Sequence, residues 1–376
     1  MNREIRGFDA VRAAARDFET YSSDLLGDRD VRTYRQLPLE ADPPRHTKFR
    51  EAVQPYFMAS RLEQFRPRFE ELARTLIHQT QPFEVTKDLA LPYVMGCLGI
   101  IFNRPQDVEE WLSWGPDVWT AESYMNGHHD ESATRAHQDR DFSVESSRSG
   151  KVLHNYLDRV FNVAVERARQ ELPEQDLWDF VARVEIDGVR VSRDEMFGIA
   201  GVLLAGGRDT VVKLISGLVW HLVQSENDRT FLAQNPSWYS RTIAEFVRFL
   251  SPLPKMERAP REQAVLPDSD RDVNQYVLLN FVSANHDREI WPDADQLDIH
   301  RDRKPHLAFG FGRHSCLGMN VTEVEVSSFL TVLTNEWPSW KFEETPQIVW
   351  VEETDKDGFP FKYIEKFSEI TVFTGE

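Results

Sequence analysis

The sequence predicts a mainly α-helical protein, a large helical domain that carries a few small β-sheets. Apolar residues recur at three- and four-residue spacing through most of the chain, as over 61–79. Strand-like runs are short and confined to 275–284 and the C-terminal segment 362–373. No internal repeat and no linker interrupts the chain, so residues 1–376 are expected to form a single domain.

Charge and cysteine content exclude several classes of function. The net charge of −18 disfavours nucleic acid and anionic membrane surfaces as partners. Two cysteines cannot build a disulfide framework in a chain of this size, which favours a reducing cytoplasm. The charged N-terminus lacks the apolar core of a signal peptide, and no apolar run is expected to reach the roughly 18 residues that span a bilayer.

The helices can be assigned in order along the chain. Segment 61–79 is predicted as a core helix, and 87–102 is apolar on all sides, so it should be buried together with its structural cysteine Cys97. Ser192 and Glu195 form a capping box, and the helix that it begins should continue to about Ser225, roughly 50 Å away.

The polar stretch 123–150 predicts a loop between two helices. It contains three histidines, but no carboxylate or cysteine stands beside them at ligand spacing, so no metal site is predicted there. They are His128, His129 and His137.

The centre of the long helix reads AGGRDT, residues 205–210. Two adjacent helical glycines cost roughly 1 kcal/mol each relative to alanine, which indicates close approach of a large flat group or a local opening of the helix. Asp209 and Thr210 in an apolar core could form a proton relay. A helix crossing with a capping polar pair explains the same residues, and this stretch alone does not decide between them.

Two further stretches carry charge at helical spacing. His46 and Arg50 follow Pro43 and Pro44 and share one face at a helix start, where the helix dipole disfavours cations. This arrangement suggests an anionic ligand, although a solvated basic face would show the same sequence pattern. Glu245 and Arg248 also share a face, a pattern that occurs in many helices.

The last chemically distinctive stretch is FGFGRHSCLG, residues 309–318, with Cys316 just before an apolar helix. A helix N-terminus offers free N–H groups and positive potential, and both stabilise a thiolate. A nucleophilic cysteine needs a base beside it, and His314 at i−2 is poorly placed to be one. A thiolate bound to a metal therefore fits better.

These residues together resemble the cytochrome P450 family of heme-thiolate monooxygenases. FGFGRHSCLG matches the family's Phe-Gly-x-Gly-x-x-x-Cys-x-Gly loop at every defined position. AGGRDT, the Glu245–Arg248 pair, the His46–Arg50 stretch and segment 284–298 resemble the family's other motifs, in the right order and over nearly the whole chain. The resemblance implies the P450 fold, with heme b held between the long central helix and the cysteine loop.

The resemblance also implies roles for individual residues. Cys316 would be the axial thiolate ligand of the heme iron, and Asp209 and Thr210 would deliver protons to dioxygen, with Gly206 and Gly207 leaving room. Glu245 and Arg248 would be structural. The residues implied to bind the cofactor are His46, Arg50, Ala205, Gly206, Arg258, Phe309, Gly310, His314, Cys316 and Gly318, and the four with cationic side chains would hold the heme propionates.

Two features depart from the family pattern. Gln296 stands where an arginine usually completes a triad with Glu245 and Arg248. The chain also begins at what resembles the family's second strand and B helix, so the usual first helix and strand are expected to be missing.

The resemblance implies separate electron donors, because the chain carries no flavin or nicotinamide motif. A ferredoxin with its reductase is expected to dock on basic residues around the thiolate face, unless these are scattered surface charges. The basic residues are Arg45, Lys48, Arg50, Arg61, Arg66, Arg303, Lys304 and Arg313.

The resemblance implies that several residues contact the substrate, namely Tyr34, Gly206, Leu253, Lys255 and Phe359. The polar 123–150 loop would cover it, which predicts a small oxygenated substrate, such as a methyl ether, that is hydroxylated or O-demethylated. A terpene or fatty acid is the second choice. A peroxide-driven peroxygenase is disfavoured by the Asp209–Thr210 pair, and a heme sensor or carrier without turnover would need no proton relay.

Overall fold

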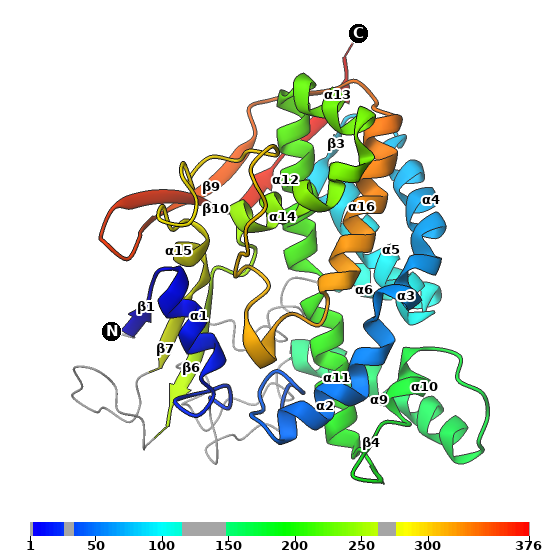
Figure 1. Ribbon diagram of the computed structural model, residues 1–376. Helices are drawn as coiled ribbons and strands as arrows, with labels where there is room; N and C mark the ends of the chain where they lie inside the picture. Colours follow the sequence, from blue (N-terminus) through cyan, green and yellow to red (C-terminus); the bar gives the residue numbers. More distant parts are fainter. Residues whose placement is uncertain (1–2, 26–33, 115–147, 262–275, 376) are drawn as a thin grey trace.

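The computed structural model describes residues 3–25, 34–114, 148–261 and 276–375, and it confirms the mainly helical fold class (Figure 1). The helices are α1 (Phe8–Arg16), α2 (Arg45–Val53), α3 (Ala59–Leu62), α4 (Arg66–Ile77), α5 (Leu91–Phe102), α6 (Val108–Ser113), α9 (Arg148–Arg169), α10 (Leu177–Val181), α11 (Arg193–Gly206), α12 (Asp209–Gln224), α13 (Glu226–Gln234), α14 (Tyr239–Leu250), α15 (Phe281–Asn285) and α16 (Met319–Asn335).

Short 3₁₀ and π-helical turns connect several of these helices. They are η2 (Gln54–Phe57), η3 (Glu63–Phe65), the π-helical η4 (Val85–Ala90), η5 (Pro105–Asp107), η7 (Pro236–Trp238) and η8 (Gly312–His314).

The helical core is built around α16, which packs against α4, α13 and α14, while α12 packs against α14 and η4. In Figure 1, α11 and α12 run end to end through the middle of the molecule beside α16. One large cluster of buried apolar side chains joins these elements. The central helices therefore form the rigid part of the fold.

The strands form small sheets, which Figure 1 shows mostly beside the helical core. One sheet has the order β1-β7-β6-β2, with β1 (Arg3–Ile5) parallel to β7 (Val277–Asn280) and β6 (Lys255–Pro260) antiparallel to β7; β2 is Tyr21–Ser22. A long hairpin pairs β9 (Gln347–Thr354) with β10 (Pro360–Glu369). The others are β3 (Phe83–Glu84) with β11 (Thr371–Thr374) and β8 (Trp340–Phe342), and the hairpin of β4 (Glu185–Ile186) and β5 (Val189–Arg190).

The long central helix is interrupted, where the sequence predicted a continuous helix to about Ser225. Its capping box is confirmed, since Ser192 N donates to Glu195 Oε2 at 2.8 Å and Ser192 Oγ accepts from Glu195 N. However, α11 ends at Gly206, and Arg208 has non-helical torsions of φ −92° and ψ −80° before α12 begins. The paired glycines weaken the helix at this point, and the local opening that they suggested is present.

Three other predicted elements also differ. Segment 61–79 is divided into α3, η3 and α4, because Pro67 lacks an N–H and starts a new helix. Segment 275–284 is a strand only to Asn280, whose side chain accepts from Ser283 N at 2.8 Å and caps α15. The predicted loop 123–150 and its histidines lie almost entirely outside the described residues.

The apolar segment Val85–Phe102 is long enough to cross a membrane, contrary to the expectation that no run reaches this length. It spans 18 residues with a mean hydropathy of 1.4, and 61% of it is buried inside the fold. Cys97 within it is fully buried, as predicted. Because α5 packs against α4 and α12, the segment has the surroundings of a core helix.

Candidate active site

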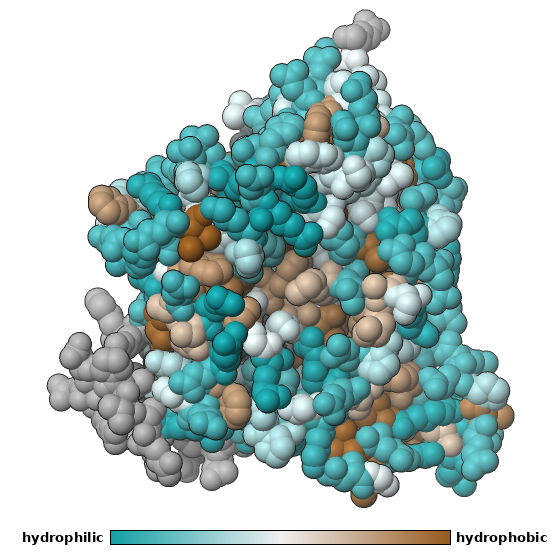
Figure 2. All heavy atoms as spheres, viewed as in Figure 1, coloured by the Kyte–Doolittle hydropathy of each residue, from teal (hydrophilic) through white to brown (hydrophobic). Residues whose placement is uncertain are grey.

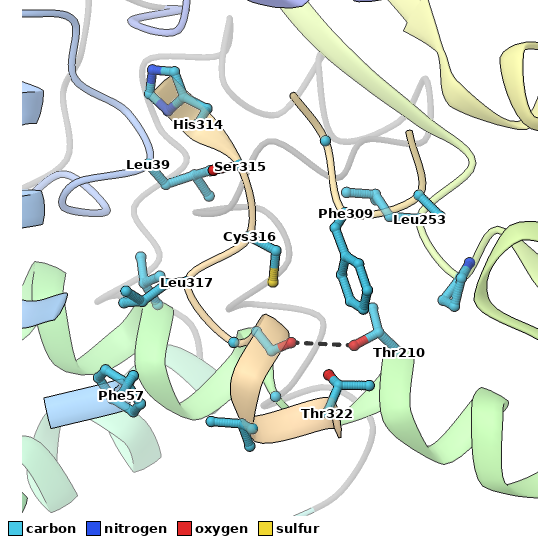
Figure 3. A pocket seen from close by; sticks show the side chains of 18 of the residues that line it. Leu39, Phe57, Thr210, Leu253, Phe309, His314, Ser315, Cys316, Leu317 and Thr322 are labelled. Atoms are coloured by element: carbon cyan, nitrogen blue, oxygen red, sulfur yellow. Dashed lines mark hydrogen bonds between the residues drawn. The ribbon is translucent and has the colours of Figure 1, made fainter. Parts of the chain in front are cut away.

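A cavity of about 240 Å³ lies between the α11–α12 break, the loop that leads into α16, and β6. Figure 3 shows the sulfur of Cys316 projecting into this space, with Thr210 on the opposite wall and Phe309 and Leu317 beside it. On the surface, Figure 2 shows apolar side chains gathered in a hollow near the middle of the face, surrounded by hydrophilic ones. The described residues thus form an internal site around one thiol.

Two glycines shape the loop that holds Cys316. Gly310 and Gly312 have φ of 67° and 74°, a left-handed conformation that other residues rarely adopt. A Cβ on Gly312 would lie 3.2 Å from Ala15 O, so this position is also sterically tight. Cys316 N donates to Phe309 O at 2.8 Å, which closes the loop beneath the cavity.

The surroundings of Cys316 do not by themselves favour a free thiolate. The side chain is open to the cavity but enclosed by the fold, and this burial raises the pKa of the Cys316 thiol, while the Gly318 N–H and Arg50 act in the opposite direction. A positively charged metal ion beside the sulfur would reverse the balance and hold it as a thiolate. The site therefore suits a metal ligand better than an isolated nucleophile.

Four side chains that can carry positive charge meet on one wall of the cavity: His46, Arg50, Arg258 and His314. The rings of His46 and His314 are 4.1 Å apart between centroids, and Arg50 Nη1 donates to Ser315 O at 2.7 Å. Both ring nitrogens of His46 are buried and lack a hydrogen-bond partner among the described residues. Buried polar groups are usually satisfied, so this wall requires a polar ligand.

The titration behaviour of this wall points to an anion. Burial, with help from Arg50, lowers the pKa of His46 to about 4. Burial, with help from Arg258, lowers that of His314 to about 2, and burial lowers the pKa of Arg258 to about 10. Burial disfavours the charged forms, and the neighbouring cations add to this for both histidines, while Asp42 acts in the opposite direction on His46 and Arg258. A ligand with two carboxylates would supply further negative charge and favour the charged forms. The predicted propionate site and the predicted axial cysteine thus fit heme.

The opposite wall is formed by the helix break. Gly206, Gly207 and Thr210 line the cavity, and Thr210 Oγ1 donates to Gly206 O at 3.3 Å, the dashed line in Figure 3. A Cβ on Gly206 would meet no protein atom within 4 Å, so the space in front of it is open. Asp209 does not line the cavity, because its side chain is 69% exposed and forms an ion pair with Arg208.

The structure brings most, not all, of the other candidate residues to the cavity. Phe309, Gly310, Gly318 and Leu253 line it, whereas Ala205 does not. Three predicted substrate contacts also lie elsewhere. Tyr34 packs against Phe197, Lys255 forms ion pairs with Glu4 and Glu353, and Phe359 is 57% exposed in the turn of the β9–β10 hairpin.

Sequence reasoning missed several apolar residues that line the cavity, and Thr322 of α16. Isolated aliphatic residues carry no motif, so no local signal identifies them. The residues are Leu39, Phe57, Val202, Leu203 and Met256.

A buried ion network beneath the site corrects the interpretation of Gln296. Arg248 donates to both carboxylate oxygens of Glu245 at 2.7 and 2.8 Å, and Arg301 Nε donates to the same carboxylate at 3.1 Å. Arg301 therefore completes the triad that Gln296 was expected to leave incomplete. Gln296 instead contributes its backbone carbonyl, which accepts from both arginines at 3.1 Å.

Several of the basic residues expected to attract an electron donor are engaged within the chain. Arg45 pairs with Glu195, Lys48 with Asp187, and Arg66 with Glu63. Arg61 lies over the ring of Tyr56 and Arg313 over that of Phe18. The three ion pairs reduce the positive charge that this surface presents to a partner, whereas Arg61 and Arg313 keep their charge over the rings.

Comparison with known proteins places this geometry in a family. Residues 237–345, which include Glu245, Arg301 and Cys316, match the family model "Cytochrome P450". The chain is 30% identical over 292 residues to the vitamin D(3) 25-hydroxylase of Pseudonocardia autotrophica, covering 76% of this chain and 66% of that protein. It is 25% identical over 335 residues to putative cytochrome P450 YjiB of Bacillus subtilis, covering 88% and 81%.

Solved structures show the same fold. A carbohydrate-active P450 aligns with a TM-score of 0.76 at 24% identity, covering 98% of this chain and 91% of that one. The ligand-free P450 TbtJ1 aligns with a TM-score of 0.78 at 21% identity, covering 99% and 91%. At these identities the likeness concerns the fold alone.

Proposed function

Because the chain belongs to the cytochrome P450 family, whose members are monooxygenases that bind heme b, we propose that Cys316 is the axial ligand of the heme iron. His46, Arg50, Arg258 and His314 would hold the two propionates through charge-assisted hydrogen bonds. The porphyrin would lie between the Cys316 loop and the α11–α12 break. When bound, the thiolate-ligated heme supplies the redox chemistry that inserts one atom of dioxygen into the substrate.

We further propose that the Thr210 hydroxyl passes protons into the cavity. Thr210 Oγ1 is the side-chain hydroxyl that α12 presents there, and it rests on Gly206 O at the helix break. Asp209, one residue before it, is exposed and can exchange protons with solvent once it leaves its ion pair with Arg208. The pair would act in sequence, with Asp209 taking a proton from solvent and Thr210 releasing one into the cavity.

The proposed electron donors are a ferredoxin and its reductase, acting in the cytoplasm. Bacterial members of the family typically take electrons from such partners, which supports the proposal. Arg313, which is exposed near Cys316, supports docking of an acidic partner, although the internal ion pairs of Arg45, Lys48 and Arg66 weaken this attraction.

The proposed substrate is a small, oxygenated molecule, such as a methyl ether, whose methyl group is hydroxylated or removed by oxidative O-demethylation. An apolar part of the described lining of the cavity suits such a group. Its members are Leu39, Val202, Leu203, Leu253 and Met256. The same wall favours a terpene or fatty acid as a second candidate.

The observation that carries the proposal is the sulfur of Cys316 projecting into a cavity that is also lined by His46, whose ring nitrogens have no hydrogen-bond partner among the described residues. The test is the Soret band of the reduced, CO-bound protein after reconstitution with heme. Wild type should show the red-shifted band of thiolate ligation and Cys316→Ser should lose it. Cys97→Ser, at the buried second cysteine, is the matched control and should keep the band. An unshifted wild-type band would refute the ligand assignment.

The substrate class is tested separately by a binding screen on the loaded enzyme. Methyl ethers are compared with hydrocarbons of equal size, and turnover is followed with ferredoxin and reductase. Formaldehyde released in equal amount to the alcohol product supports O-demethylation, whereas hydroxylated terpenes or fatty acids support the second candidate. Product formed with peroxide alone would indicate a peroxygenase, and binding without product a sensor.

A further inference from the structure

Ser23 connects the propionate wall to the N-terminal part of the chain. It follows directly after β2, and its Oγ lies 3.0 Å from Nε2 of His314, which is 291 residues later in η8. Ser23 is buried, with 4% of its surface exposed, so water has little access to compete for this contact. Among the described contacts, the Ser23 hydroxyl has no other partner.

Asp42 holds Ser23 in this position. One carboxylate oxygen accepts from Ser23 N at 3.0 Å, and the other accepts from Ser22 Oγ at 2.5 Å and Arg261 Nη2 at 2.6 Å. The backbone carbonyl of Asp42 accepts from His46 N at 2.9 Å. Asp42 thus connects the end of β2, the end of β6 and the start of α2. Of these segments, α2 contains His46, and Ser23 at the end of β2 contacts His314.

The contact determines which nitrogen of His314 faces a ligand. With Nε2 engaged by Ser23, Nδ1 is the ring nitrogen left to meet a carboxylate in the cavity. A serine hydroxyl can donate to Nε2 or accept from it, so the contact orients the ring whichever nitrogen carries the proton. With Nε2 held by Ser23, the Nδ1–H group of His314 can donate to a carboxylate in the cavity.

We infer that Ser23 is a positioning residue that holds the His314 ring with Nδ1 toward the cavity, and that Asp42 holds Ser23 in place for this purpose. This inference rests on the proposed role of His314 at a heme propionate. Ser23 does not touch the cofactor itself, and it acts through His314. Its substitution should therefore weaken heme retention without changing the thiolate ligand.

The test measures the rate at which the loaded protein releases heme to an excess of heme-free myoglobin. Loss of one hydrogen bond predicts that Ser23→Ala releases heme roughly two- to tenfold faster than wild type. Ser23→Thr keeps the hydroxyl and should stay within about twofold. Ser113→Ala is the matched control, because the Ser113 hydroxyl is exposed and, among the described residues, bonds the Glu110 carbonyl of its own helix.

A double-mutant cycle distinguishes an effect of Ser23 that acts through His314 from a general loss of structure around the heme. In a His314→Ala background, adding Ser23→Ala should cause no further acceleration, because the partner through which Ser23 acts is gone. Asp42→Asn, which loses one acceptor oxygen, should accelerate release in the same direction, but part of its effect should persist in that background because the Asp42 carboxylate also holds Arg261. It serves as the second variant if Ser23→Ala does not fold.

Unchanged heme release from both Ser23→Ala and Asp42→Asn, or an acceleration by Ser23→Ala that persists without His314, would overturn the inference. The CO-bound Soret band of each variant distinguishes this from failure of the proposed function. A normal thiolate band with unchanged release rates rejects only the role of Ser23, whereas an unshifted band in wild type rejects the heme-thiolate site itself.

Discussion

Arg301 Nε donates to the Glu245 carboxylate at 3.1 Å, although 56 residues separate the two in the chain. The same carboxylate accepts two hydrogen bonds from Arg248, and both arginines also bind backbone carbonyls of the segment before the cysteine loop. Glu245 and Arg248 are 7% and 2% exposed. The network therefore fastens α14 to the chain that leads to Cys316, and its charges are compensated inside the fold.

Arg301→Ala should lower the free energy of unfolding by about 2–4 kcal/mol, because it leaves Glu245 with one compensating arginine and frees the carbonyls of Pro292 and Asp293. Gln296→Ala should change it by less than about 0.5 kcal/mol, since Gln296 contributes its backbone. Urea denaturation of the two variants checks this contrast. Equal losses would mean that the Gln296 side chain has a role that its contacts do not indicate.

Thr210→Ala should reduce coupled product formation at least about tenfold, because it removes the hydroxyl that α12 presents to the cavity. Oxygen consumption, peroxide and product are measured together with a substrate found in the screen. Thr210→Ser keeps a hydroxyl and should retain most of the coupling. An alanine variant that remains fully coupled would remove Thr210 from the proton path.

Lys213 on α12 should make stability depend on alkaline pH. Its amine donates to Leu250 O at 2.9 Å, and burial lowers the pKa of Lys213 to about 7. Between pH 7 and 10.5 the unfolded chain binds more protons at this group than the folded chain, so the free energy of unfolding rises with pH across that window.

Lys213→Met should remove this rise and stabilise the protein at pH 7 by about 1–2 kcal/mol, after the lost hydrogen bond is taken into account. Urea denaturation at pH 7 and at pH 10 measures the difference. Lys362→Met, at an exposed lysine of β10, is the control and should show the wild-type pH dependence. If the Lys213→Met protein is less stable than wild type at pH 7, the charged Lys213 side chain stabilises the fold.

Glu353 belongs to an ion network that joins β1, β6 and β9. Lys255 Nζ lies 2.6 Å from Glu353 and 2.8 Å from Glu4, and Arg6 pairs with both carboxylates. Although burial acts in the opposite direction, hydrogen bonds from Lys255 and Arg6 lower the pKa of Glu353. Its contribution to stability is therefore present above the unfolded pKa near 4.5 and is lost as the pH falls below it.

Glu353→Gln should destabilise the protein by about 1–2 kcal/mol at pH 7, with a smaller difference from wild type near pH 4. Glu352→Gln, next in the chain but exposed and paired with Lys362 alone, should cost less than about 0.5 kcal/mol. Thermal unfolding at the two pH values compares them. Equal effects of the two variants would show that burial of the network does not increase its contribution to stability.

The sequence by itself determined the class of fold and the chemistry of the site. The glycines before Cys316, the helix after it and the His46–Arg50 face are local features, because each depends on residues within one loop or one helical turn. The structure places Cys316, His46, Arg50, Arg258 and His314 around one cavity, as these local patterns and the family resemblance indicated.

Only the tertiary structure decided which distant residues meet. Arg301, not the position of Gln296, completes the Glu245 network, Asp209 turns away from the cavity toward Arg208, and Lys255 joins Glu4 and Glu353 instead of a substrate. Ser23 reaches His314 across 291 residues. Such pairings depend on how loops and strands pack. The spacing of residues along the chain therefore does not predict a contact between residues of different elements.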